Sequence, residues 1–224
     1  MKAAFLAASA AMLMAGSAQA STTIGGFTFT SSATSVISVG PTNASDWSTF
    51  GVPFGPNAAA TLAAALTDNN PATGASYSPA PGTVTLGFAN GILNGNGNDF
   101  VLFDFIDPKS FTVTINNVSV TRLASATSST VTVPSSIVPL SLNAAAFDLT
   151  DFGLAAGSSI SSVHILLGPN APGFNTVLSY AGVLNTGTGA VVPEPSTWML
   201  MIMGFGLIAQ QLRRRHRGVA QVAA

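Results

Sequence analysis

The chain has 224 residues, of which 47% are hydrophobic and 7% are charged, and its formal net charge is −1. It contains no cysteine, which excludes disulfide bonds and a cysteine nucleophile. Four of its seven basic residues lie in one cluster near the C-terminus and form no broader basic face, so we do not expect nucleic acid as a partner.

The N-terminus has the three parts of a secretory signal peptide. Met1-Lys2 is a short positive region, residues 3–16 are apolar, and Ala18-Gln19-Ala20 is a small-x-small cleavage site. We therefore expect residues 1–20 to be removed by signal peptidase, so that the mature chain begins at Ser21. An uncleaved N-terminal anchor is the alternative, but the apolar run is too short for it.

Residues 21–185 predict an all-β ectodomain. Hydrophobic residues alternate with polar ones in short runs that are separated by turn residues, which is typical of a single β-sandwich. The predicted strands are 26–30, 35–39, 83–88, 100–106, 111–115, 118–122, 131–133, 137–142, 163–167 and 177–184. Residues 58–66 are the one helix candidate, and residues 41–56 are expected to be irregular.

Three segments of this domain carry a more specific prediction. The continuous apolar run 100–106 predicts a strand that is buried on both faces. Asn116-Asn117 predicts a two-residue turn that joins strands 111–115 and 118–122 in a hairpin. The tract 94–99, Asn-Gly-Asn-Gly-Asn-Asp, predicts a flexible polar turn.

Parts of the ectodomain also resemble discoidin-like, galactose-binding-like domains. Residues 66–73, Leu-Thr-Asp-Asn-Asn-Pro-Ala-Thr, resemble the Asp-rich loop of those domains. Residues 94–104 and 148–157 resemble segments of secreted bacterial sandwich domains. The resemblance implies a jelly-roll sandwich and carries no ligand with it. The aromatic residue that usually follows the first loop is displaced to Tyr77.

The ectodomain offers little catalytic chemistry. It has no glutamate, and its one histidine, His164, lies within a predicted strand, where we expect it to be half-buried. It contains seven aspartates and only two basic residues, Lys109 and Arg122, so its net charge is −5. Most of the aspartates occupy predicted turns. A catalytic triad needs a histidine base beside its nucleophile, and glycoside hydrolysis needs two carboxylates that flank a cleft. We therefore expect no enzymatic activity.

Calcium is the one cofactor that the residues suggest, because it binds carboxylate and amide oxygens. The candidate ligands are Asp68 with Asn70, and Asp99. Plain turns are the alternative for both segments. Trp47, Tyr77 and Tyr180 are candidate sugar-contacting aromatics: if they are exposed, a carbohydrate-binding module is favoured, and if they are buried, a structural scaffold is favoured.

The tail has three parts after a predicted linker, 186–192. Pro193-Glu194-Pro195 is held extended by its prolines. Residues 197–212 form an apolar segment that spans about 24 Å as a helix, which predicts a short transmembrane helix with Trp198 at one interface. The basic cluster consists of Arg213, Arg214, Arg215 and Arg217. This cluster predicts a cytoplasmic C-terminus with 218–224 as its tail, and it disfavours a buried core helix.

These parts together resemble the PEP-CTERM sorting signal of Gram-negative bacteria, in its Pro-Glu-Pro-x-x-Trp-Ala variant, with Met199 in place of the alanine. The resemblance implies that exosortase, a membrane-embedded cysteine transpeptidase, processes the chain. It also implies export through the inner membrane, transient anchoring there, and delivery to the cell surface or extracellular matrix. We therefore expect a structural protein of the envelope or exopolysaccharide (biofilm) matrix; a carbohydrate-binding module for exopolysaccharide is the alternative.

Overall fold

The computed structural model describes residues 21–42, 46–53, 55, 57–78, 81–134, 136–167 and 176–186, which belong to one compact unit. The predicted signal peptide up to Ala20, the linker after Thr186, the sorting motif, the transmembrane segment and the basic cluster lie outside the described residues. None of the described helices is long and apolar enough to cross a membrane.

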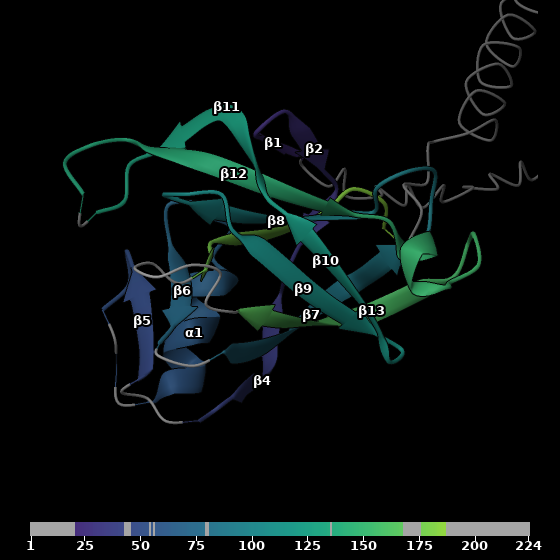
Figure 1. The fold of residues 1–224 in the computed structure, drawn as a ribbon, viewed down its shortest axis with the longest axis horizontal. Helices are drawn as coiled ribbons and strands as arrows, with labels where there is room; N and C mark the ends of the chain where they lie inside the picture. The colour runs from purple at the N-terminus through teal and green to yellow at the C-terminus, as the bar shows by residue number, and fades with distance from the viewer. Residues whose placement is uncertain are drawn as a thin grey trace, which may run out of the picture. The chain divides into compact units, whose positions relative to one another are not determined.

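Two five-stranded antiparallel sheets form the body of this unit (Figure 1). The first sheet has the order β11-β12-β8-β15-β3 and the second has the order β10-β9-β13-β7-β4. The first consists of β11 (Ser125–Val131), β12 (Leu140–Phe147), β8 (Phe100–Phe105), β15 (Tyr180–Val183) and β3 (Ser31–Ser32). The second consists of β10 (Val118–Leu123), β9 (Ser110–Ile115), β13 (Ser159–Leu167), β7 (Gly82–Leu93) and β4 (Ser35–Gly40).

The connections give these sheets a jelly-roll order. The chain crosses from β7 in the second sheet to β8 in the first, returns to the β9–β10 hairpin, and crosses again to β11–β12. It then passes to β13 in the second sheet and ends on β15 in the first. Neighbours in each sheet are therefore mostly distant in sequence, as in other jelly rolls. The predicted all-β, jelly-roll-like sandwich is confirmed.

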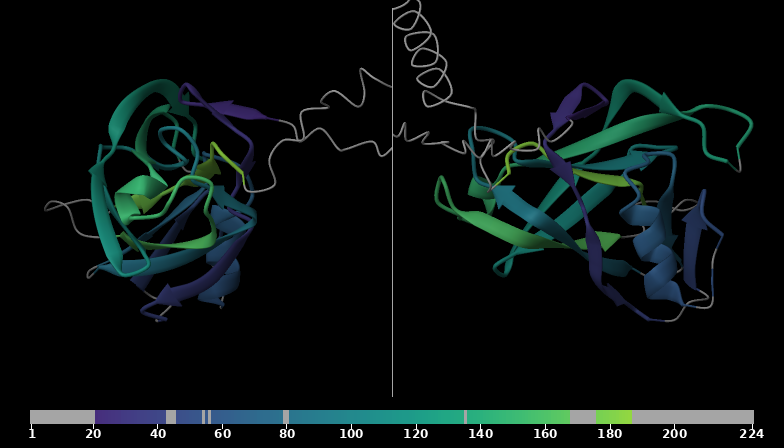
Figure 2. Two further views of the ribbon diagram at one scale, coloured as in Figure 1. Left: turned by 90° about the vertical axis from the view of Figure 1, so that its right-hand side faces the viewer. Right: turned by 180° about the vertical axis from the view of Figure 1, so that it is seen from behind.

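Strand β8 is buried on both of its faces, as predicted, because the first sheet has a cover on each side. Phe100 and Leu102 pack between the sheets, against Val84 and Val163 of the second sheet. The alternate residues of β8, Val101, Phe103 and Phe105, belong to a second cluster. The hairpin β1 (Thr22–Ile24) and β2 (Phe27–Phe29) contributes its Ile24 and Phe29 to that cluster and lies beside β11 and β12 (Figure 2).

The predicted helix and hairpin are both confirmed. Helix α1 (Ala58–Leu66) starts at Asn57, whose side-chain oxygen accepts a hydrogen bond from the Ala60 amide at 3.2 Å. Asn116 and Asn117 have φ values of 49° and 65°, as a two-residue hairpin turn requires, and Ile115 pairs directly with Val118.

Residues 41–56 were wrongly predicted to be irregular throughout, because Trp47–Phe50 form strand β5. This strand joins β6 (Gly74–Tyr77) and β14 (Val177–Leu178) in a small third sheet. Four residues are too few for a clear alternation, and the pairing partners lie far along the chain.

Several strand bounds also differ from the prediction. Strand β11 ends at Val131, where a strand 131–133 was predicted. Strand β12 starts only at Leu140, because Pro139 has no amide to donate, and this leaves Ile137 and Val138 exposed. The single predicted strand 177–184 is divided between β14 and β15.

Candidate functional site

The outer face of the second sheet is covered with hydroxyl groups. Because Val84, Val113 and Ile165 point into the core, the residues that alternate with them point to solvent. Register places one polar residue from each of the five strands side by side: Ser38, Thr85, His164, Thr114 and Ser119. We call these five residues the hydroxyl row.

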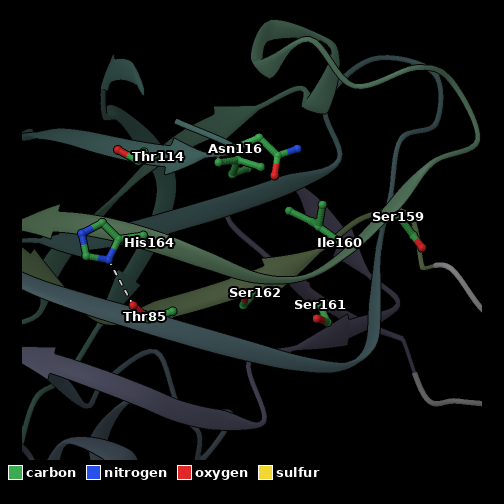
Figure 3. Close-up of a pocket in the computed structure, with 9 residues that line it drawn as sticks. Thr85, Thr114, Asn116, Ser159, Ile160, Ser161, Ser162 and His164 are labelled. Carbon is green, nitrogen blue, oxygen red and sulfur yellow. Dashed lines mark hydrogen bonds between the residues drawn. The ribbon is translucent and has the colours of Figure 1, made fainter. Parts of the chain in front are cut away.

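Hydrogen bonds link the hydroxyl row in two groups, Ser38–Thr85–His164 and Thr114–Ser119. Thr85 Oγ1 lies 2.8 Å from Ser38 Oγ. The same oxygen lies 3.0 Å from His164 Nδ1 (Figure 3). Thr114 Oγ1 lies 2.7 Å from Ser119 Oγ. His164 is exposed, so the expectation that it is half-buried was wrong: it occupies an outward position of β13. Sequence analysis missed the row, although the alternation of Thr and Ser with Val and Ile signals it locally.

An open hollow of about 370 Å³ lies beside His164 (Figure 3). The pairing of β13 with β7 shifts register between Ile160 and Ser162 at one side of the hollow, because β7 carries extra residues there, and the Asn116 turn stands at another side. The hollow is lined by Thr85, Thr114, Ile115, Asn116, Ser159, Ile160, Ser161, Ser162 and His164. It thus combines hydroxyl, amide and imidazole groups with the apolar side chains of Ile115 and Ile160.

This chemistry suits hydrogen bonding to a neutral, hydroxyl-rich ligand. Side chains of Thr and Ser both donate and accept, and each such bond contributes little net free energy in water. The imidazole of His164 is hydrogen-bonded to the Thr85 hydroxyl through its Nδ1 atom, the position that a carboxylate occupies in a catalytic triad.

The three candidate aromatic residues are all buried. Trp47, Tyr77 and Tyr180 expose 4%, 4% and 5% of their surface. Trp47 donates its indole hydrogen to the Pro41 carbonyl at 3.0 Å and packs edge-on against Tyr77. Tyr180 packs against Phe29 in the second cluster. None of the three offers a face to a sugar ring, which favours the structural scaffold over an aromatic sugar platform.

The candidate calcium ligands Asp68 and Asn70 are placed together in one turn after α1. Asp68 Oδ1 accepts hydrogen bonds from the Asn70 amide at 2.9 Å and from Thr73 Oγ1 at 3.0 Å. Asn70 Oδ1 accepts from the Ala72 amide at 3.0 Å. These are the local bonds by which Asp and Asn stabilise a plain turn.

The third candidate ligand, Asp99, is fully buried and links three segments. Its Oδ1 accepts from the Gly95 amide and from Asn185 Nδ2, both at 2.8 Å, and its Oδ2 accepts from the Leu149 amide at 2.8 Å. The tract 94–99 is therefore anchored, and the expectation of a flexible turn was wrong. In the described part of the chain, no group of three or more His, Cys, Asp or Glu could hold a metal, and calcium binding stays a prediction.

Comparison with known proteins identifies the tail. Residues 191–217 match the family model described as the PEP-CTERM protein-sorting motif, which confirms the sorting-signal resemblance. No curated protein and no solved structure matches the chain, so the discoidin-like resemblance is not confirmed. The chain therefore carries a signal for export, for membrane-associated sorting to the cell surface and for processing by exosortase.

Proposed function

We propose that this protein is a structural component of the bacterial envelope or exopolysaccharide matrix. In this proposal, signal peptidase cuts after Ala20, residues 197–212 hold the chain in the inner membrane, and exosortase then acts near Pro193-Glu194-Pro195. The sandwich is delivered to the surface and has no catalytic activity. The observation that carries the proposal is the PEP-CTERM match at 191–217, which follows the compact sandwich directly.

The surface of the sandwich supports this assignment. Its core takes up the large aromatic side chains, and its outer sheet face presents neutral hydroxyl groups. A hydroxylated sheet face suits a protein that is packed among hydrated polysaccharide, because its hydroxyl groups can both donate hydrogen bonds to sugar hydroxyls and accept them.

The test compares the full chain with a chain that ends at Ala190, expressed in the producing strain. We expect the full chain in the surface and matrix fractions. The shortened chain keeps the signal peptide, so it should still be exported. It should be absent from the surface and matrix fractions and should collect in the periplasm or the medium. A chain that lacks only residues 218–224 is the matched control and should behave as the full chain does. Equal surface fractions for the full chain and the chain that ends at Ala190 would contradict the proposal.

The hydroxyl row favours a second candidate function, weak binding of exopolysaccharide. Many weak hydrogen bonds on crowded copies can retain a polymer through effective concentration, even where one sugar unit binds too weakly to measure. The double variant Thr85→Val, Thr114→Val should migrate faster than the wild type through a gel that contains exopolysaccharide from the producing strain. The double variant Thr23→Val, Thr28→Val removes two exposed hydroxyls from the β1–β2 hairpin and is the control.

Calorimetry with the constituent monosaccharides should show no measurable heat. If both double variants migrate equally, the hydroxyl row does not bind exopolysaccharide. Micromolar binding of one monosaccharide would instead indicate a dedicated lectin-like site.

A further inference from the structure

A carboxyl group and an amide group lie side by side inside the sandwich. Asp104 of β8 pairs directly with Asn143 of β12, and each exposes 1% of its surface. Asp104 shares its strand face with Leu102, and Asn143 shares its face with Ala145 and Phe147. Both side chains therefore point into the apolar core between the two sheets.

Neither side chain makes a hydrogen bond of ordinary geometry, although the backbone amides of Phe105 and Val177 lie near enough to the Asp104 carboxyl to lower its pKa. Both carboxyl oxygens of Asp104, and both the oxygen and the nitrogen of the Asn143 amide, are buried and unpaired. The neighbouring buried hydroxyl of Ser179 donates to the Phe103 carbonyl at 3.2 Å. Unpaired buried polar atoms each cost about 1–3 kcal/mol, so a direct bond between the two side chains is strongly favoured.

The surroundings of Asp104 favour its neutral form. The charged groups that act on it are Lys109 and Asp107 of the β8–β9 turn; Lys109 lowers its pKa and Asp107 raises it. Lys109 makes no ion pair with Asp104 within the described residues. Burial has the largest effect and outweighs Lys109 and the nearby amides of Phe105 and Val177, so the pKa of Asp104 rises to about 8.

We propose that Asp104 and Asn143 form a proton-dependent clasp between β8 and β12. The neutral carboxyl donates its hydrogen to Asn143 Oδ1 and accepts one from Asn143 Nδ2. Directly opposed residues of an antiparallel pair have Cβ atoms about 4.5–5.5 Å apart, so side-chain rotation alone closes these bonds. Loss of the proton at alkaline pH leaves a buried charge opposite an amide oxygen and loosens the centre of the first sheet.

A bound cation is the competing explanation for the same four atoms. Calcium takes 6–8 oxygens, whereas this pair offers at most three, next to apolar neighbours such as Leu102 and Ala145. The clasp needs no further ligand.

The clasp makes stability depend on pH with a definite sign. A folded-state pKa of about 8 lies above the ordinary aspartate pKa of 3.8, so the folded chain binds the extra proton. The stabilisation is complete below about pH 4 and is lost as pH rises toward 8. Between pH 6 and pH 9 the unfolding equilibrium constant should rise about 100-fold, and it should level off above that range.

The test is urea unfolding of the purified exported chain at pH 6, 7.5 and 9. The wild type should follow the predicted rise, whereas Asp104→Asn, which keeps a neutral side chain of the same shape, should be flat over this range. Asp151→Asn, an exposed aspartate that pairs with Arg122 and does not act on Asp104, is the matched control and should keep the pH dependence of the wild type. A flat wild type, or a variant Asp104→Asn that keeps the pH dependence, would overturn the clasp.

Two measurements on the wild type keep the proposal testable if Asp104→Asn does not fold. Infrared spectra of the folded chain should show the C=O band of one protonated carboxyl at pH 6, and this band should be absent at pH 9. Added calcium and added chelator should leave the unfolding midpoint unchanged at pH 7.5. A calcium-dependent midpoint, or the lack of the carboxyl band at pH 6, would refute the clasp.

Discussion

Replacing Phe103 by Ala tests whether the two-sided burial of β8 stabilises the whole sandwich. Phe103 is fully buried in the central strand of the first sheet. Its ring lies 5.8 Å from Phe29, 5.9 Å from Tyr180 and 6.1 Å from Phe27, in edge-on arrangements. The substitution removes the ring from the second cluster and separates the β1–β2 hairpin from the sheet.

The expected loss is about 3–5 kcal/mol of unfolding free energy, the usual range for a buried Phe→Ala change. Three ring pairs, each contributing about 0.5–1.5 kcal/mol beyond burial, place this site toward the upper end. The assay is urea unfolding followed by far-UV circular dichroism. Val118→Ala, on the edge strand β10, is the control and should cost less than about 0.5 kcal/mol, since Val118 is exposed. A loss below about 1 kcal/mol for Phe103→Ala would show that the second cluster is not a cooperative part of the fold.

Three further substitutions have defined outcomes. Asp99→Ala removes the acceptor for the buried amide of Leu149 and for the partly buried amide of Gly95. It should cost about 2–5 kcal/mol in urea unfolding and make the 94–99 tract sensitive to protease. Asn117→Val places a β-branched residue at φ 65° and should lower the unfolding free energy by about 1–2 kcal/mol. Amide exchange in β9 and β10 should become faster, and unchanged exchange would contradict the tight turn. His164→Ala should change stability by less than about 0.5 kcal/mol because the ring is exposed, and a larger loss would show that the hydroxyl row is structural.

Local patterns were sufficient for several elements of the fold. The apolar run at 100–106 predicted a doubly buried strand because both faces of β8 have a cover. The Asn116-Asn117 pair predicted its hairpin because both residues tolerate positive φ. Strand β5 was missed because four residues give no clear period, and its pairing with Tyr77 bridges a helix and two loops.

The candidate site could be predicted only in part, because it depends on pairing between distant strands. The Thr-x-Thr pattern at 83–85 indicates an outward hydroxyl face of one strand, but only the order of the second sheet brings Thr85 beside His164 and Thr114. The burial of Trp47 depends in the same way on its contact with Tyr77. Asp104 stood within an apolar run, and nothing local indicated that Asn143 would be opposite it.

The intact mass of the protein recovered from the cell surface tests the central claim most directly. The account predicts a chain that starts at Ser21 and has lost the segment from Trp198 onward, including the arginines that follow it. This result would establish processing at both ends around an intact sandwich. Recovery of mainly full-length chain, with Arg217 still attached, would contradict the account.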